Sequence, residues 1–323
     1  MKRILSIGML LAMCCTWMVF ADDAKTMPAR VGRFYVAPSF SFVNGAYDDD
    51  GELDKFGDDE GAVKVFNLGF ALEYGILDWL TAALQWAPGW TIWSDVDTVV
   101  NPLATDQKIN INGVYDLFLG AKIQIIGEKA PVKSSMFRLA IAPGIKIPLP
   151  GTDFDDQYEN LMKGDDVTIQ NADKHVFAFG GRFYFDFIIH PMFFINLYSE
   201  FIYYPVKGKA DNIIYHLGDL DTEYGFDLTF ELEPHFEMAF DAGTLGIGLP
   251  LNYTMFADKK YDTVGIDDVT DASLLKLSPN IAFMLTKIAL PLEFKLTYAI
   301  PLYGMNYNAL NTVSLQIRLY FRI

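Results

Sequence analysis

The chain has 323 residues, of which 51% are hydrophobic and 15% aromatic, and its formal net charge is −16 at pH 7. A chain this acidic repels the phosphate backbone of nucleic acids, so we expect no nucleic-acid partner. The two cysteines, Cys14 and Cys15, both fall in the apolar segment near the start of the sequence. The rest of the chain therefore has no thiol for a disulfide, a thiolate metal site or a cysteine nucleophile.

The first residues have the pattern of a secretory signal peptide. Two basic residues precede an apolar run over residues 4–20, and Ala21 is followed by two aspartates. This pattern predicts a signal peptide over residues 1–21, cleaved after Ala21, and a single domain over residues 22–323. One alternative is a retained membrane anchor, because the apolar run is almost long enough to cross a bilayer. Another is a lipoprotein processed at Cys14.

Alternation of apolar and polar residues is the main pattern in the rest of the chain. No later segment is apolar for the roughly 18 consecutive residues that a transmembrane helix needs. In residues 177–187, phenylalanines occupy alternate positions, with Arg182 and Asp186 between them. Such segments suit strands with one face toward lipid and the other toward water. Twelve segments follow this pattern, at residues 33–42, 66–74, 81–86, 115–124, 137–146, 177–187, 193–203, 226–240, 245–255, 277–285, 290–298 and 313–322.

The connections between these segments alternate in length. Connections after odd-numbered segments are long and acidic, as at residues 44–61, and only the last of them, at 304–311, is shorter. Connections after even-numbered segments are short, as at 75–78. Outer-membrane barrels have short periplasmic turns and longer outer loops, and they close because every backbone group in hydrocarbon must be paired. The sequence therefore predicts an all-β fold, a closed antiparallel transmembrane β-barrel of about twelve strands with long acidic extracellular loops. A soluble β-sandwich is the alternative.

Charged residues in the strands share the face opposite the apolar one, so we expect them in the lumen. The strongest acidic run is in segment 226–240, and the bases gather in segments 137–146, 177–187 and 313–322. Opposed charges could select polar solutes in a narrow wet pore, or pair off and fill the lumen. The candidate acidic residues are Asp186, Glu200, Asp227, Glu231, Glu233 and Glu237, and the candidate basic residues are Arg138, Lys146, Arg182, Arg318 and Arg322.

The sequence offers little for catalysis or for metal binding. Its four histidines are His175, His190, His216 and His235, and none has a serine beside it in a pattern typical of barrel hydrolases. The acidic segment 48–60 does not match the spacing of a helix-loop-helix calcium site. We therefore predict no enzyme activity, no cofactor and no metal site.

Prolines interrupt several of the predicted strands. A proline cannot donate a backbone hydrogen bond, so each marks a bulge or a kink. We expect tolerated bulges, and the alternative is a kinked wall that opens sideways toward lipid. The prolines are Pro38, Pro143, Pro234, Pro250 and Pro279.

Three segments carry a resemblance to outer-membrane transport barrels. The hairpin at residues 72–80 and the strand at 137–148 look like those of the fatty-acid and aromatic-hydrocarbon channel barrels of bacteria with two membranes, of Gram-negative or spirochaete type. The fatty-acid channels also have an N-terminal plug of several tens of residues; here about ten residues precede the first segment, so no such plug is expected. The last five residues, 319–323, resemble the C-terminal signal for the barrel-insertion machinery, although the aromatic Phe321 lies before the end.

This resemblance and the strand pattern together lead to one functional hypothesis. We expect a passive channel or transporter for small solutes in the outer membrane, with membrane lipid and the insertion machinery as its partners. The alternative is a surface-exposed structural or adhesive barrel whose lumen is closed by side chains.

Overall fold

The computed structural model describes most of the chain after the predicted signal peptide. The described residues are 23–55, 63–94, 109–113, 117–149, 159, 163, 167–169, 174, 176–212, 217–262, 268 and 270–323. Within these ranges there is no helix long and apolar enough to cross a membrane.

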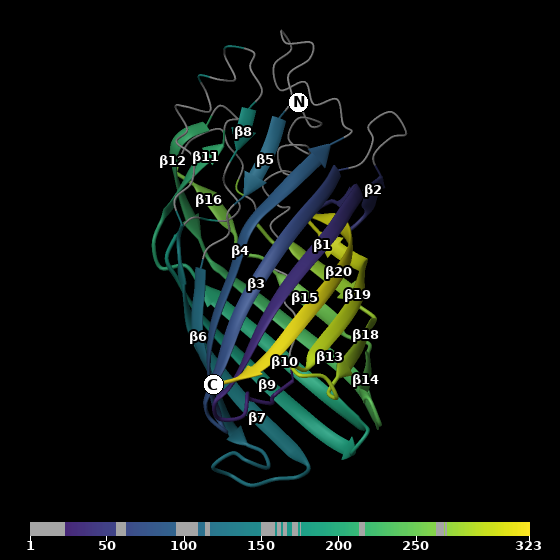
Figure 1. The fold of residues 1–323 in the computed structure, drawn as a ribbon. Helices are drawn as coiled ribbons and strands as arrows, with labels where there is room; N and C mark the ends of the chain where they lie inside the picture. The colour runs from purple at the N-terminus through teal and green to yellow at the C-terminus, as the bar shows by residue number, and fades with distance from the viewer. Residues whose placement is uncertain are drawn as a thin grey trace.

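Twelve antiparallel barrel strands form a closed β-barrel, as the sequence predicts (Figure 1). The ninth and tenth are each interrupted. In circular order the strands are β1 (Val31–Tyr47), β3 (Val63–Leu77), β4 (Leu80–Ser94), β6 (Leu117–Ile126), β7 (Phe137–Ile147), β9 (Ala178–His190), β10 (Phe193–Tyr203), β13 (Phe226–Phe240), β14 (Gly243–Gly248) with β15 (Leu251–Met255), β18 (Asn280–Leu285) with β17 (Ser273–Leu277), β19 (Leu292–Met305) and β20 (Tyr307–Arg322).

The first and last strands close the barrel. β1 pairs with β20 from Val31 opposite Arg322 to Tyr47 opposite Tyr307, and on its other side it pairs with β3. Neither long edge of the sheet is left open, which a sheet in hydrocarbon requires because lipid offers no hydrogen-bonding groups.

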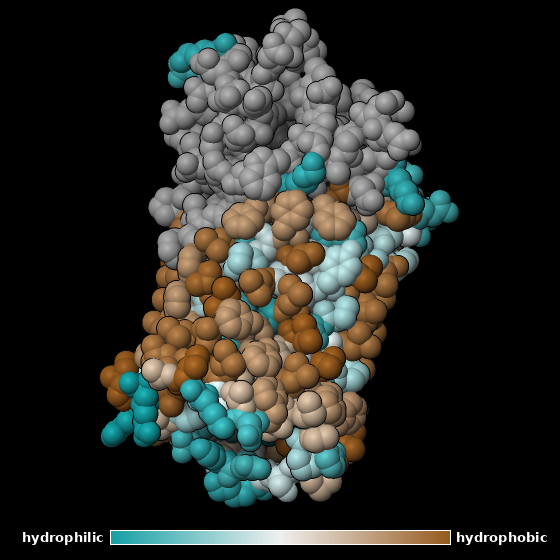
Figure 2. Space-filling model, turned by 45° about the vertical axis from the view of Figure 1, so that its right-hand side comes forward, coloured by the Kyte–Doolittle hydropathy of each residue, from teal (hydrophilic) through white to brown (hydrophobic). Residues whose placement is uncertain are grey.

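The alternation in sequence becomes an apolar outer surface and a polar interior. On β1, Phe34 and Phe40 are each 38% exposed on the outside, whereas the inward Arg33 is 4% exposed. Figure 2 shows hydrophobic side chains covering the middle of the barrel wall, with hydrophilic side chains at the lower, periplasmic end. The predicted fold class is therefore confirmed.

The interruptions of the ninth and tenth strands lie at prolines. Pro250 separates β14 from β15, and Pro279 separates β17 from β18. With Pro234 near the middle of β13, they form a row across three neighbouring strands, which we call the proline seam. Each of the three accepts a backbone hydrogen bond from the next strand, but cannot return one because proline has no N–H. The accepted bonds run from Leu249 to Pro234 (3.1 Å), Ser278 to Pro250 (2.8 Å) and Tyr298 to Pro279 (3.1 Å).

The outer connections differ from the prediction in two ways. The sequence predicts a loop at residues 304–311, but β19 and β20 meet in a tight turn at Asn306, whose φ of 47° an asparagine tolerates. That prediction is wrong because the polar residues of the segment pair within the sheet. The other outer connections contain short strands: β2 (Leu53–Lys55), β5 (Ile109–Gly113), β8 (Val167–Ile169), β11 (Gly208–Asn212), β12 (Leu217–Tyr224) and β16 (Lys259–Tyr261).

Three of these short strands form a separate small sheet at the extracellular end. β12 pairs with both β11 and β16, so the connections after the seventh and ninth barrel strands are joined. The ammonium of Lys207 lies 2.8 Å from the carboxylate of Glu223 and holds the pKa of that carboxyl below its usual value.

Candidate functional site

The lumen is the candidate functional site, and many of its charges are paired between adjacent strands. Arg138 contacts Asp186 at 2.6 Å, directly across from it in the register of β7 and β9. Arg182 pairs in the same way with Glu200 on β10. The sequence left open whether the lumen charges face each other across a wet pore or pair off locally. These four residues pair off locally.

Two further ion pairs lie near the periplasmic end and have the same cross-strand geometry. Arg33 on β1 contacts Glu73 on β3 at 2.6 Å. Arg318 on β20 contacts Glu293 on β19 at 3.0 Å, and the hydroxyl of Tyr320 donates to the same carboxylate at 2.5 Å. Sequence parity placed these side chains inside, but only the register shows which acid meets which base.

Aromatic rings cover several of the lumen cations. The ammonium of Lys122 lies 4.0 Å from the centre of the Tyr184 ring, and the guanidinium of Arg182 lies 4.4 Å from that of Phe118. Arg138 similarly faces Phe194 at 5.0 Å. These contacts fill one side of the lumen, along β6, β7, β9 and β10, with stacked side chains.

Asp227 joins several connections at the extracellular end of the barrel. Its carboxylate accepts hydrogen bonds from the Lys174 ammonium at 3.0 and 3.2 Å, from the Tyr204 hydroxyl, and from the backbone N–H of Ala257 at 2.7 Å. Buried Val176 packs nearby with Tyr204 and Ala257. One acidic side chain therefore joins three connections that are far apart in sequence.

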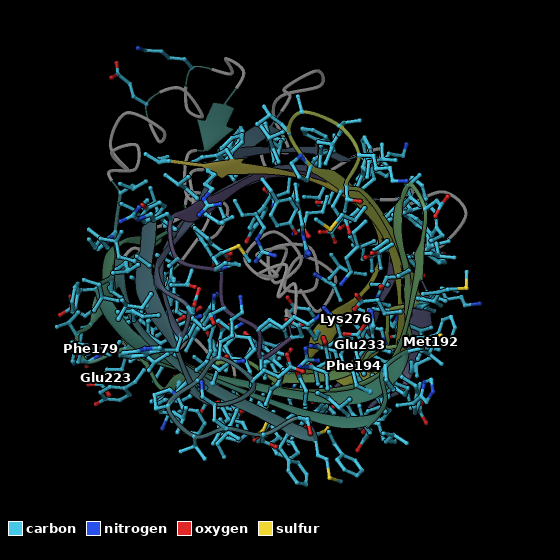
Figure 3. All side chains as sticks on the ribbon, turned by 60° about the horizontal axis from the view of Figure 1, so that its bottom comes forward. Phe179, Met192, Phe194, Glu223, Glu233 and Lys276 are labelled. Carbon is cyan, nitrogen blue, oxygen red and sulfur yellow. The ribbon has the colours of Figure 1, made fainter. Side chains whose placement is uncertain are left out.

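The other acids of β13 have different surroundings. Glu231 accepts a hydrogen bond from Asn252 at 3.2 Å, and its second oxygen is buried without a partner in the described part of the chain. Glu233 contacts the Nδ1 atom of His235 at 3.0 Å and the amide of Asn280 at 3.3 Å. Figure 3 shows Glu233, with Phe194 and Lys276, inside the ring of strands, whereas Phe179 and Met192 lie on its outside.

Two candidate basic residues lie apart from these pairs. Lys146 is completely buried, with its ammonium 5.3 Å from the centre of the Tyr204 ring. Arg322 is exposed at the periplasmic end, where it lies opposite Val31 in the closing pair of strands.

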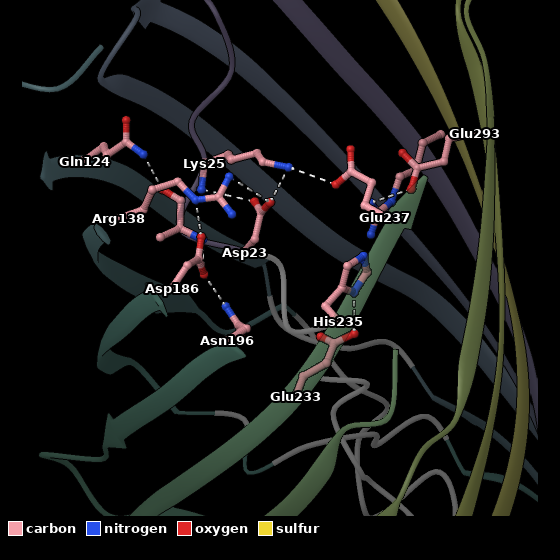
Figure 4. A network of polar contacts seen from close by, with 12 residues as sticks. Asp23, Lys25, Gln124, Arg138, Asp186, Asn196, Glu233, His235, Glu237 and Glu293 are labelled. Atoms are coloured by element: carbon pink, nitrogen blue, oxygen red, sulfur yellow. Dashed lines mark hydrogen bonds and ion pairs between the residues drawn. The ribbon is translucent and has the colours of Figure 1, made fainter. Parts of the chain in front are cut away.

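Residues 23–30 enter the lumen from its periplasmic mouth, and we call them the strap. Ala24 is fully buried, and its backbone N–H donates to the carboxylate of Asp186 (Figure 4). Its carbonyl accepts a hydrogen bond from Gln124 at 2.9 Å, and Lys122 donates to the carbonyl of Asp23. Strand parity gave no signal that this short segment would lie inside the barrel.

The side chain of Lys25 crosses the lumen from the strap. Its ammonium contacts Asp23 at 2.9 Å and Glu237 on β13 at 3.3 Å. The strap is therefore joined to β6 and β9 on one side of the lumen and to β13 on the other.

The lower part of the strap follows the turn between β3 and β4. Thr26 donates to the carbonyl of Asp78 at 2.8 Å, and the N–H of Met27 donates to the Thr81 hydroxyl at 2.8 Å. Gly75 is necessary for this path, because a Cβ atom there would lie 2.1 Å from the carbonyl oxygen of Pro28.

Two cavities of very different size border the strap, within the part of the chain that the structure describes. The larger, on the periplasmic side, has a volume of about 340 Å³ and is bordered by β13, β14, β18, β19 and β20. The smaller has a volume of about 40 Å³ and lies toward β4, β6 and β9. Lys25, Met27, Arg33 and Arg318 line both cavities, so they form the constriction between them.

The described residues do not assemble a candidate metal centre. They contain no group of three or more histidine, cysteine or acidic side chains placed to hold a metal ion. Asp48, in the acidic segment considered for calcium, accepts the backbone N–H groups of Asp50 and Glu52 at 3.1 and 2.7 Å. His175, His216 and residues 56–60 lie outside the described residues.

Comparison with known proteins supports the fold. No protein-family model and no curated protein matches the sequence. Among solved structures, the chain is similar to an outer membrane channel from Pseudomonas putida F1, with a TM-score of 0.67, 14% identity, and coverage of 94% of this chain and 100% of the channel. It is also similar to a FadL homologue from Pseudomonas aeruginosa, with a TM-score of 0.40, 8% identity, and coverage of 92% and 91%. The chain thus has the fold of an outer-membrane β-barrel.

Proposed function

We propose that this protein is a passive channel for small solutes in the bacterial outer membrane and that the strap narrows its lumen at rest. The observation that carries the proposal is the periplasmic cavity of about 340 Å³, which leads to a constriction made by the strap and two lumen arginines. A cavity lined by charged groups and ending at a short peptide held by polar contacts suits a gated pore. The channel with a similar fold is consistent with this function.

Passage requires the strap to move or its side chains to swing aside. The smaller cavity, of about 40 Å³, has room for only a few water molecules. The strap forms no sheet with the barrel wall, and polar contacts hold it at Asp186, Gln124 and Thr81. Such contacts are each worth about 1–3 kcal/mol, so the strap can leave while the barrel stays intact.

Planar lipid bilayers test the proposal. Purified mature protein is expected to give small conductance steps, and a variant lacking residues 23–28 is expected to give larger ones. The heat-dependent shift of folded barrels in gel electrophoresis verifies that the variant is folded. Membranes that stay silent with both folded proteins would refute the channel.

The alternative function is a surface-exposed structural or adhesive barrel. The observation that favours it is the ordered extracellular end, where β11, β12 and β16 form a sheet and Asp227 joins the connections. In that case the ion pairs serve only to keep the barrel rigid. Silent bilayers combined with ligand binding that depends on the extracellular connections would support this alternative.

Export and insertion belong to the same proposal. We propose that residues 1–21 are removed as a signal peptide and that β20, which ends in outward apolar residues, is recognised by the barrel-insertion machinery. Cleavage after Ala21 would leave only Asp22 before Asp23. The carbonyl of Asp23 accepts a hydrogen bond from Lys122 inside the lumen.

A further inference from the structure

One row of lumen residues has opposite charges at its ends and almost no side chains between them. Across four neighbouring strands, Glu237 on β13 lies opposite Gly246, Gly246 opposite Ala282, and Ala282 opposite Lys295 on β19. Three inter-strand steps of about 4.8 Å separate the outer backbones by roughly 14 Å. Gly246 has no side chain and Ala282 has only a methyl group, so the row forms a slot. The His235 imidazole borders this slot, with its Nε2 atom 3.3 Å from where a Cβ atom of Gly246 would lie. All four residues of the row line the larger cavity.

The neighbouring row keeps the slot open. Gly248 lies beside Glu233, and a Cβ atom at Gly248 would be only 1.8 Å from the Glu233 carboxylate. The Glu233 side chain therefore lies over a position without a side chain, and it is held there by His235 and Asn280.

The basic end of the slot lacks a contacting anion. Lys295 is 9% exposed and lines the cavity, and among the described residues no hydrogen bond or ion pair is formed by its ammonium. Glu231 and Glu233 attract it from a greater distance. A mostly buried ammonium is costly without a partner, so this end favours a carboxylate from outside the chain.

The acidic end of the slot already binds an ammonium. The Oε2 atom of Glu237 contacts the ammonium of Lys25 at 3.3 Å, and the Glu237 side chain is still 37% exposed. The other carboxylate oxygen, Oε1, forms no hydrogen bond or ion pair with the described residues. An ammonium supplied by a solute can therefore be bound beside Lys25.

From this arrangement we propose that the larger cavity binds a small zwitterionic solute, with its ammonium at Glu237 and its carboxylate at Lys295. The solute lies along Gly246 and Ala282, beside His235, and bridges two opposite charges that form no ion pair with each other. This inference builds on the proposed channel function and names the class of solute that occupies the channel before the constriction.

A series of ω-amino acids measures the slot. The test uses equilibrium binding of glycine, 3-aminopropanoate, 4-aminobutanoate and 5-aminopentanoate to the detergent-purified mature protein. We expect saturable binding that depends on chain length, with the best member binding at least tenfold more tightly than the amine or the acid of the same length. Equal binding of the matched amine or acid, or no saturation by any member, would overturn the inference.

Variants locate the binding site. Lys295→Gln is expected to weaken binding of the best amino acid about tenfold or more and to leave binding of the matched amine unchanged. Ala282→Leu fills the slot without changing charge and is expected to abolish binding. Lys129→Gln removes a lysine charge from the exposed turn between β6 and β7 and serves as the matched control. If Lys295→Gln and Ala282→Leu are folded and bind like the control variant, the inference is wrong.

Binding and conductance separate the two proposals. Saturable binding by a protein that is silent in bilayers would refute the channel and retain the site. Conductance without zwitterion-selective binding would retain the channel and refute the site.

Discussion

The backbone N–H of Ala24 donates to the carboxylate of Asp186, at 3.2 and 3.1 Å from its two oxygens, although 162 residues separate them. The same carboxylate accepts a hydrogen bond from Asn196 at 2.7 Å and contacts Arg138 at 2.6 Å. One fully buried acid therefore joins β7, β9 and β10 to the strap, which narrows the lumen.

Replacement of Asp186 should release the strap. Asp186→Asn keeps the shape of the side chain but removes the charge that Arg138 and the Ala24 N–H share, and we expect it to weaken strap docking by about 1–3 kcal/mol. Single-channel conductance should rise several-fold, toward that of the variant lacking residues 23–28. Asp241→Asn, in an exposed periplasmic turn, is the control. Unchanged conductance of folded Asp186→Asn would show that this contact does not hold the strap.

A steric change at Gly75 should have the same effect by a different route. The Cβ atom of Gly75→Ala would collide with the Pro28 carbonyl, so the strap has to leave the turn between β3 and β4. The control is Gly69→Ala on the same strand, where the nearest atoms to the new Cβ lie 3.8 Å away. In bilayers, the double variant Gly75→Ala/Asp186→Asn should have a conductance no larger than that of the more conductive single variant. Both substitutions release the same strap, so their effects should not add. Full additivity would indicate two separate effects.

Loss of the Asp227 carboxylate should loosen the extracellular end. Asp227→Ala leaves Lys174 and Tyr204 without their buried acceptor, which costs about 3–5 kcal/mol in comparable buried pairs. We expect protease added to intact cells or to proteoliposomes to cut near residues 204–212 and 256–262 faster, while the barrel remains folded. Asp262→Asn, at an exposed residue directly after β16, is the control. Equal cleavage rates in both variants would contradict the role of Asp227.

The proline seam should be the weakest part of the barrel wall. Because Pro234, Pro250 and Pro279 do not return hydrogen bonds, amides of β14, β15, β17 and β18 should exchange with solvent deuterium faster than those of β20, as measured by mass spectrometry. Pro250→Ala restores one donor and should slow exchange on the adjoining strands. β1 is the comparison, because its single Pro38 has no neighbouring proline in register. If the amides of β14, β15, β17 and β18 are protected from exchange as strongly as those of β1, the seam is not weakened. That result would also remove the basis for a sideways opening.

Processing of the chain should leave a free amino terminus close to the lumen. Mass spectrometry of protein purified from outer membranes should find Asp22 as the first residue. The strap brings Asp23 to Lys122 inside the barrel, where a retained apolar segment of about twenty residues would have to thread the lumen. Detection of an intact N-terminal segment in the folded protein would contradict both the predicted cleavage and this path for the strap.

Periodicity of the sequence was enough to predict the barrel. Phe34 and Phe40 on one face and Arg33 on the other report which side of a strand meets lipid, because side chains alternate strictly along a strand. The same parity placed Asp186, Glu200 and Arg182 in the lumen. The number of alternating segments predicted twelve strands, and the need to pair every backbone group in hydrocarbon predicted that they close into a barrel.

Only the tertiary structure decided how these residues are placed. Asp186 and Ala24 come into contact, and Glu237 and Lys295 come to line one cavity, through strand register and closure of the barrel. Periodicity within a single segment contains no information on either. The strap is held by polar contacts to β3, β6 and β9 and is not a strand of the barrel. No alternation of apolar and polar residues therefore marks it in the sequence. The proline seam likewise exists because three separate strands align their prolines at one level of the wall.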